Sequence, residues 1–199
     1  MPRPIAKDYE FKRDHILQAA ARLFAQQGFA GASMAALAQE CQISKANIYH
    51  YYSGKDALLF DLLDTYLRAL HHKIKSLEFN EVPPDQKLFL LVREILFAYQ
   101  GMDYQHQVQL NEMQHLPAAK QDILRSYQRD MIAIMSAVIA EIAPFLASRK
   151  KSKLHSVTMS VFGMLNWFYM WNRQGGKEAR ENYARVVTDL TLKGILSDH

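Results

Sequence analysis

A short stretch from Ser44 to Lys55 combines small, polar, aromatic and basic residues at helical spacing. Ser44 is suited to cap a helix, which turns the partial positive charge of the first helical turn outward. Lys45 and Asn47 are then candidates for base edges, because lysine donates to guanine acceptors and asparagine pairs with adenine. Ala46, between them, is small enough to lie against a thymine methyl group. The stretch therefore predicts a helix that reads the major groove of duplex DNA.

The second half of this stretch suits the phosphate backbone of DNA. Tyr49, His50 and Tyr51 are hydrogen-bonding aromatic residues one turn further along. Lys55 then begins the next helix. Side chains of these types bond phosphate oxygens, which fix the register of a protein on DNA but carry no sequence information. Ser33, which caps the preceding helix, completes the predicted DNA-binding set.

The residues around this stretch form an extended pattern. It begins at Ile16 with a first amphipathic helix that ends Phe-Ala-Gln-Gln-Gly-Phe at residues 24–29. After Ser33 it continues with Met-Ala-Ala-Leu-Ala-Gln-Glu-Cys-Gln-Ile-Ser-Lys-Ala-Asn-Ile-Tyr-His-Tyr-Tyr at residues 34–52. Lys-Asp-Ala-Leu-Leu at residues 55–59 completes it. As a set spread over about a quarter of the chain, the pattern resembles the TetR family of transcriptional regulators. The resemblance implies a helix-turn-helix in which the first helix braces the second.

One position departs from the family pattern. The turn between the two helices carries Gln42, where the family usually has glycine. This position normally requires a left-handed backbone, which costs a non-glycine residue about 1 kcal/mol. We therefore expect a slightly strained turn and an intact motif.

The composition is that of a globular protein with a modest positive charge. Hydrophobic residues make up 49% and charged residues 22% of the 199 residues, and the net charge is +4. Seven basic and four acidic residues through position 55 place +3 of that charge beside the predicted DNA-reading helix. The single cysteine, Cys41, fits a reducing compartment and is expected to be buried. The sequence shows no signal peptide and no membrane span, so we expect a cytoplasmic protein.

Apolar residues recur at helical spacing through most of the chain, without the period-two alternation of strands. We predict an all-α protein of about nine helices, with a DNA-binding domain at residues 1–56 and a ligand-binding and dimerisation domain at 57–199. Residues 1–7 are expected to form a terminal arm, and the helix from 55 to 77 is expected to act as a lever between the domains. The expected helices cover residues 8–28, 34–41, 45–52, 55–77, 87–100, 103–115, 117–149 with a kink at Pro144, 154–172 and 177–196.

The carboxy-terminal part is rich in large, adaptable side chains from several expected helices. Aromatic residues and methionines of this kind line mostly apolar pockets, although they also form ordinary cores. Polar residues among them would set ligand specificity, and Gln100, Glu112, Arg125 and Asn166 are the candidates. The predicted effector-binding set is Phe97, Gln100, Met113, Arg125, Tyr127, Met131, Met164, Trp167, Phe168 and Trp171.

The last two expected helices carry more apolar surface than one neighbouring face can cover. The residues concerned are Val161, Met164, Leu165, Phe168, Trp171, Tyr183, Val186, Val187, Leu190, Leu192 and Ile195. A two-fold interface of two helices from each chain would bury them, and the family resemblance implies the same homodimer. Two identical DNA-reading heads would then bind a palindromic operator with half-sites about one helical turn apart.

Three segments near the carboxy terminus form a second pattern. They are Phe-Gly-Met-Leu-Asn-Trp-Phe-Tyr-Met-Trp at 162–171, the pair Gly175 and Gly176, and Leu-Thr-Leu-Lys-Gly-Ile-Leu at 190–196. They are similar to regulators that sense acyl-CoA thioesters, and the pattern His-Tyr-Tyr-x-x-Lys-x-Ala-Leu-Leu resembles the phenylacetate regulators. The resemblance implies that Trp167 flanks an acyl chain and that Arg125 or the basic residues of 149–153 meet the CoA phosphates. An exposed loop is the other interpretation of 149–153.

Other classes of protein fit the sequence less well. No glycine-rich phosphate loop, nucleophile elbow or cysteine–histidine cluster occurs, so catalysis has no supporting motif and no cofactor is expected. Asp103 with His106, and Glu112 with His115, have the carboxylate-x-x-histidine spacing of di-iron bundles. Both pairs lie in one short expected helix and cannot converge on a metal from opposite walls. The alternatives that stay open are a helical small-molecule-binding protein and a regulator with an apolar effector other than a CoA ester.

Overall fold

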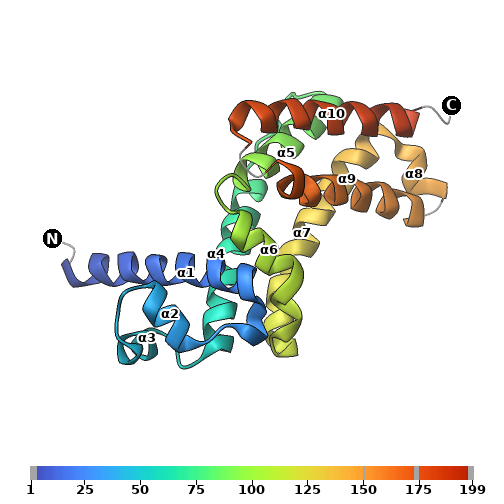
Figure 1. Cartoon of the computed structure of the whole chain (residues 1–199). Coiled ribbons are helices and arrows are strands. Elements are labelled where there is room, and N and C mark those ends of the chain that lie inside the picture. Colours follow the sequence, from blue (N-terminus) through green and yellow to red (C-terminus); the bar gives the residue numbers. More distant parts are fainter. Residues whose placement is uncertain (1–3, 150, 173–174, 197–199) are drawn as a thin grey trace. The chain divides into compact units, whose positions relative to one another are not determined.

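The structure is a computed structural model that describes residues 4–149, 151–172 and 175–196, with only the backbone described at 4–7, 147–149 and 151–152. Within these ranges the chain contains ten α-helices, one short 3-10 helix and no strand (Figure 1). The predicted all-α fold is therefore confirmed. No helix in the described ranges is long and apolar enough to cross a membrane.

The helices form two compact units, which we call the head and the body. The head contains Met1–Leu67 and Tyr104–Arg125, and the body contains Arg68–Asp103 and Ser126–His199. The head therefore includes segments from both sides of the boundary expected at residue 56. Because the helices α4 and α7 cross the limits of these segments, each of them contributes residues to both units.

The first helix of the head, α1 (Pro4–Gly31), begins earlier than expected. Residues 4–7 are helical, whereas the sequence predicted a terminal arm there, and residues 1–3 lie outside the described residues. Proline at the first position of a helix is favourable, because its missing N–H has no partner there in any case. The predicted stop at Gly28 is a kink, with φ 71° and ψ 161°, after which the helix continues to its end.

The next two helices, α2 (Met34–Glu40) and α3 (Lys45–Tyr51), form the predicted helix-turn-helix. Gln42 in the turn between them has φ 56°, which is the left-handed backbone expected where the family usually has glycine. Cys41, just before it, is buried, and burial raises the pKa of its thiol above the ordinary value. The motif is therefore intact and carries one strained residue.

Replacing Gln42 with glycine is expected to raise the free energy of unfolding by up to about 1 kcal/mol, because glycine adopts a left-handed backbone without steric cost. The Gln42 side chain is exposed, so its removal loses no core packing. Gln39→Gly, at an exposed position of α2, is the matched control and is expected to lower the same free energy by about 1 kcal/mol. Urea denaturation followed by circular dichroism measures both changes, and two shifts of the same sign would contradict the strained turn.

The fourth helix, α4 (Lys55–Lys75), is the long helix predicted at 55–77. It ends two residues early, where Leu77 N–H turns back to the carbonyl of Ile74 at 3.3 Å. Its predicted apolar stripe is buried throughout, at Leu58, Leu59, Leu62, Leu63, Tyr66, Leu67 and Leu70. This stripe fixes which face of α4 turns inward and leaves its polar side chains for specific contacts.

The head is completed by α6 (Asp103–Glu112), the 3-10 helix Met113–His115 and the start of α7 (Ala118–Ile142). The first two elements together span the single helix expected at 103–115. Gln107 of α6 donates through Nε2 to the carbonyl oxygen of Ala25 in α1 at 2.9 Å. This contact is one of those that place α6 with the amino-terminal helices.

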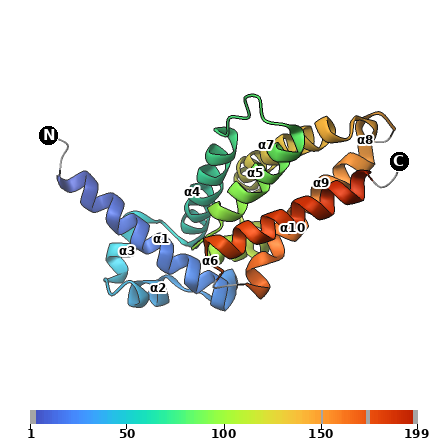
Figure 2. The ribbon, with the colours of Figure 1, turned by 90° about the horizontal axis from the view of Figure 1, so that it is seen from above.

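The body contains α5 (Pro84–Ala98), α8 (Pro144–Arg149), α9 (Lys151–Trp171) and α10 (Lys177–Leu196), together with the later part of α7. Figure 2 shows α5 running beside α10, and these two helices also contact α9. The kink expected at Pro144 is a complete break between α7 and α8, since proline lacks the N–H that would continue the helix.

Candidate DNA-binding site and effector region

The helix α3 is fixed at its start by the predicted cap. Ser44 Oγ accepts a hydrogen bond from Asn47 N–H at 3.1 Å, and Ser33 Oγ caps α2 in the same way through Ala36 N–H at 3.0 Å. Ile48 is completely buried and anchors the inner side of α3. Because α3 is capped at its start and packed through Ile48, its outer side has a fixed orientation.

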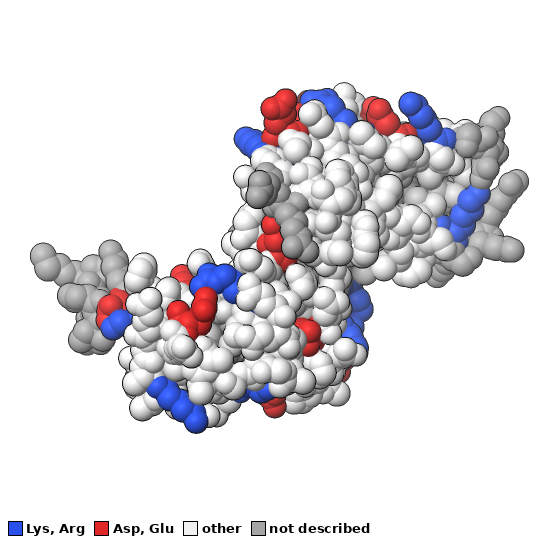
Figure 3. All heavy atoms as spheres, in the orientation of Figure 1, with Lys and Arg blue, Asp and Glu red and all other residues white. Residues whose placement is uncertain are grey.

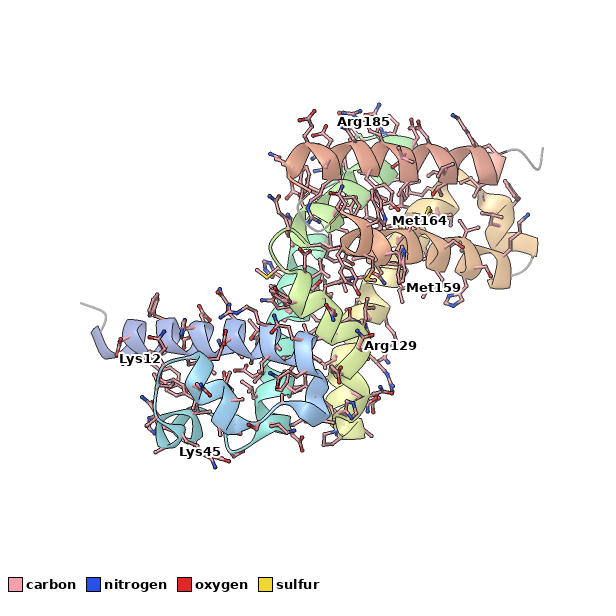
Figure 4. The ribbon with its side chains drawn as sticks, viewed as in Figure 1. Lys12, Lys45, Arg129, Met159, Met164 and Arg185 are labelled. Atoms are coloured by element: carbon pink, nitrogen blue, oxygen red, sulfur yellow. The ribbon has the colours of Figure 1, made fainter. Side chains whose placement is uncertain are left out.

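The outer side of α3 carries the residues predicted to read bases. Lys45, Ala46 and Asn47 are all exposed, as are Tyr49 and His50 one turn later. Lys45 Nζ lies 5.8 Å from the centre of the Tyr49 ring, a cation–π arrangement that orients the lysine without neutralising it. Figure 4 shows Lys45 on the side of the head opposite α1, and Figure 3 shows basic side chains along that margin. The geometry matches a helix that offers small and hydrogen-bonding side chains to a groove.

A partly buried polar network that the sequence did not reveal connects α1, α4 and the residue after α3. Tyr52, which follows α3, donates its hydroxyl to Asp61 Oδ2 of α4 at 2.7 Å. Arg13 of α1 binds both oxygens of the same carboxylate, at 2.9 and 2.6 Å, and also donates to Thr65. Burial and the neighbouring carboxylate raise the pKa of Tyr52 above its ordinary value, so the hydroxyl stays a donor. In the sequence, Asp61 and Asp64 both stand next to leucines of α4, and nothing local shows that Asp61 forms this network.

Tyr51 belongs to the predicted phosphate-contacting set and is half-buried. Its ring stacks on that of Tyr9 with centroids 4.8 Å apart and meets His50 edge to face at 5.7 Å. The ring of Tyr51 is therefore supported by Tyr9 of α1, and its phosphate contact stays a prediction.

Lys55, predicted to contact a phosphate, has hydrogen-bond partners within the chain. Its ammonium donates to the carbonyl oxygens of Phe29 and Ala32 at 2.7 and 2.8 Å, and it lies 3.4 Å from that of Ala30. It also lies 4.7 Å from the centre of the Phe29 ring. These acceptors are the carbonyls left open at the end of α1, which attract a cation. Lys55 therefore links the start of α4 to the end of α1, and its contact with a phosphate stays a prediction.

The residues predicted to bind an effector come from both units. Met113 and Arg125 belong to the head, where Arg125 donates to Gln121 at 2.7 Å, and the other eight belong to the body. Met131 and Phe168 are buried, Phe97, Tyr127 and Met164 are half-buried, and Gln100 is exposed. Phe168 stacks on Tyr183 with centroids 4.9 Å apart, which makes it part of an aromatic cluster between α9 and α10.

The two tryptophans of α9 are placed on the surface rather than in an interior pocket. Trp167 is 60% exposed and Trp171 is 57% exposed. Trp171 nevertheless packs edge to face on Tyr183 of α10, with ring centroids 5.1 Å apart. Trp171 keeps an edge contact with Phe168 at 5.0 Å. The expectation that both tryptophans bind an effector stays a prediction, and their exposure places any such contact at the surface of the body.

The body does contain polar side chains buried among apolar ones. Asn166, one of the predicted specificity residues, accepts a hydrogen bond from the buried Tyr99 hydroxyl at 3.1 Å. Burial raises the pKa of Tyr99, which keeps the hydroxyl protonated. The basic run of 149–153 lies largely outside the residues whose side chains are described, and Lys153 is exposed.

The carboxylate–histidine pairs of α6 and the following turn have protein partners. The buried ring of His106 is hydrogen-bonded through Nδ1 to the Tyr66 hydroxyl at 2.9 Å. Glu112 accepts from Phe29 N–H at 3.2 Å and lies 3.3 Å from His115 Nε2. Among the described residues, no three His, Cys, Asp or Glu side chains come together as metal ligands would. These contacts connect α6 with α4 and α1 inside the head.

The capped outward-facing helix and its bracing partner define a helix-turn-helix regulator. Residues 16–62 match the family described as bacterial regulatory proteins, tetR family, and residues 81–195 match the tetracyclin repressor-like, C-terminal domain. The chain belongs to the TetR family of bacterial transcriptional regulators. The family resemblance seen in residues 16–59 is thereby confirmed.

Individual relatives agree with this assignment. The HTH-type transcriptional repressor NicS of Pseudomonas putida is 24% identical over 203 residues, which span 96% of this chain and 95% of that protein. YerO of Bacillus subtilis, named an HTH-type transcriptional regulator, is 36% identical over 67 residues, which span 34% of this chain and 23% of that protein. This second match therefore extends over less than a quarter of its relative.

Solved structures share the fold. A TetR-family transcriptional regulator from Bordetella parapertussis has a TM-score of 0.85 and 30% identity, covering 93% of this chain and 96% of that chain. AibR, solved in complex with isovaleryl coenzyme A and operator DNA, has a TM-score of 0.73 and 20% identity, covering 90% of this chain and 97% of that chain.

Proposed function

We propose that the chain is an effector-responsive transcriptional repressor that binds operator DNA as a homodimer. The observation that carries this proposal is the outer side of α3, where Lys45, Ala46 and Asn47 are exposed on a helix capped by Ser44 and anchored by Ile48. Lysine and asparagine donate to or pair with purine edges, while the small residue between them lets the helix approach the groove. Tyr49, His50 and Tyr51 then contact phosphates and set the register.

Selection from a random duplex library, followed by fluorescence anisotropy on the enriched sequence, tests the DNA-binding part of the proposal. The enriched sequence is expected to be palindromic, because two identical heads related by a two-fold axis read two half-sites. A library that yields no enriched sequence would contradict the proposal.

The homodimer is supported by the exposed apolar faces of α9 and α10. Besides its tryptophans, α9 exposes Met159 and Met170, and α10 exposes Val186 and Leu190, of which Leu190 is 58% exposed. Figure 1 shows these two helices side by side within the body. Exposed apolar faces of this kind mark an interface, and two helices from each chain form a four-helix bundle across a two-fold axis.

Replacing Leu190 with glutamate is expected to convert the dimer into a monomer, because the change places a charge in the centre of the proposed apolar interface. Light scattering after size-exclusion chromatography measures the mass, and operator binding should fall by at least about tenfold as the second half-site contact is lost. Lys177→Glu places a carboxylate at an exposed position on the opposite side of the same helix and should leave the dimer intact. A dimeric Leu190→Glu variant would exclude this face as the interface.

The proposed mechanism is a shift in population between two conformations. The effector-free dimer holds its two α3 helices at operator spacing, and an effector that prefers another conformation lowers the population of that state. A coupling free energy of about 1 to 3 kcal/mol weakens DNA binding severalfold to a hundredfold. Anisotropy with saturating effector tests this, since an unchanged operator affinity would contradict the repressor mechanism.

The proposed effector is an acyl-CoA or aryl-acyl-CoA thioester. Support comes from the similarity of residues 162–171 and 190–196 to regulators of that type, and from AibR, which was solved with isovaleryl coenzyme A. Melting temperatures measured with free CoA, several acyl-CoA esters and the matching free acids test the assignment. A ligand at a hundred times its dissociation constant adds about 2.7 kcal/mol to the free energy of unfolding. A shift with a thioester and none with its acid is expected; shifts only with other apolar compounds would support the alternative effector class.

A further inference from the structure

A groove of about 730 Å³ lies in the head beside α3. Its wall includes Lys45 and Tyr49 of α3, Ser33 before α2 and Ser53 before α4. On another side it is lined by Lys120, which belongs to the first turn of α7. The groove therefore joins the helix-turn-helix to a residue from a helix that lies outside the region matched to the DNA-binding family, residues 16–62.

Lys120 lines this groove, and its ammonium has no carboxylate partner among the described residues. Its Nζ lies 5.0 Å from the centre of the Phe60 ring of α4, which orients the ammonium but accepts no hydrogen bond of ordinary strength. Across the described part of the chain, the Lys120 ammonium makes no ion pair with a carboxylate, and the same holds for Lys45. Lys55 also lines the groove, but its donors are directed at the carbonyls of α1.

The chemistry of the groove is that of an anion site with several neutral donors. The lining contains the ammonium groups of Lys45 and Lys120, which have no carboxylate partner in the described part of the chain, and the hydroxyls of Ser33 and Ser53. Asp56 is the one acid in this lining. A phosphate oxygen accepts from ammonium and hydroxyl groups alike, and a strand of DNA presents one phosphate for about every 3.4 Å of helix axis. A DNA backbone that meets Tyr49 in the groove can therefore also meet the two serine hydroxyls and the Lys120 ammonium.

We propose that Lys120 binds a phosphate of the operator backbone, so that the DNA interface extends from the helix-turn-helix to the start of α7. This inference rests on the proposed operator binding. The ligand is the sugar–phosphate backbone, and the contact adds affinity without adding sequence preference. Phe60 and the first turn of α7 support Lys120 within the head. Lys120 is therefore a fixed part of the proposed DNA-facing surface.

Lys120→Met tests the proposal, since methionine keeps an apolar stem over Phe60 and removes only the ammonium. The measurement is the slope of log affinity against log salt on the enriched duplex and on a base-substituted copy. Each lost phosphate contact should reduce the steepness of that slope by about 0.9 for every bound protomer, with equal relative losses on both duplexes. Lys120→Arg should keep the wild-type slope, and Lys75→Ala, which removes an exposed charge from the body, should also leave it unchanged.

An unchanged slope for Lys120→Met, or an equal reduction for Lys75→Ala, would overturn the proposed contact. A loss on the enriched duplex alone would also overturn it, because a backbone contact acts on every sequence. If the affinity of the wild-type protein for both duplexes does not depend on salt, operator binding itself is overturned. This outcome is distinguishable from the others because it concerns the wild-type protein. A melting curve for each variant verifies that the fold is retained.

Discussion

Replacing Ala46 with glutamate is expected to weaken operator binding by at least about a hundredfold, or about 3 kcal/mol, while leaving the fold intact. Ala46 is exposed on α3 between Lys45 and Asn47, so a longer side chain there would hold both of them away from the base edges. The added carboxylate also repels the phosphates on either side of the groove. Fluorescence anisotropy on the enriched duplex measures the loss, and a thermal melt checks the fold.

Ala137→Glu is the matched control for this prediction. Ala137 is also an exposed alanine in a helix, but it lies in the part of α7 that belongs to the body. The two variants carry the same charge and nearly the same change in helix propensity. If both bind the operator as tightly as the wild type, α3 is not the reading helix; if both lose binding equally, net charge rather than position governs affinity.

Replacing Arg180 with alanine is expected to lower the free energy of unfolding by about 3 to 5 kcal/mol, which is the usual cost of removing one partner from a buried charged network. Arg180 is only 2% exposed. Its guanidinium donates to the carbonyl oxygens of Gly175 and Leu96 at 3.2 and 3.0 Å, and lies 3.8 Å from Asp103 Oδ1. It also covers the Phe168 ring at 5.1 Å. One side chain of α10 therefore joins α5, α9 and the start of α6.

Urea denaturation measures the effect of Arg180→Ala against two companions. Arg185→Ala removes an exposed arginine from the same helix and should change the free energy of unfolding by less than about 1 kcal/mol. Arg180→Lys keeps the charge but not the planar fork, so an intermediate loss is expected. A wild-type denaturation midpoint for Arg180→Ala would show that the network contributes little.

The local features of the head were predictable from short-range patterns. Ser33 and Ser44 each precede an apolar repeat in the sequence, and each caps the helix that follows it. In α4 the leucines recur at intervals of three and four residues, and they are buried as that spacing predicts. The left-handed backbone of Gln42 was predictable because this turn normally carries glycine, which adopts that conformation without steric cost. Each of these depends on neighbours within about one helical turn, which is why the sequence alone was sufficient.

The features that sequence reasoning missed depend on contacts between distant residues. The acceptors of Lys55 lie 23 to 26 residues earlier in the chain, and nothing near Lys55 indicates them. Periodicity shows that Trp167 and Trp171 lie on an apolar helix but not what covers that face. A buried arginine such as Arg180 carries the same local pattern as an exposed one. Long-range packing decides these cases, so they required the structure.

The central claim is that this chain reads a specific DNA sequence through α3, and a titration of wild-type protein against two duplexes tests it most directly. The duplexes are the sequence enriched by the protein and a scrambled copy of equal length, each measured by anisotropy at several salt concentrations. We expect the enriched sequence to bind at least about a thousandfold more tightly, with affinity falling steeply as salt increases on both. Equal affinity for the two sequences, or affinity that does not respond to salt, would contradict the claim and would favour a helical carrier protein instead.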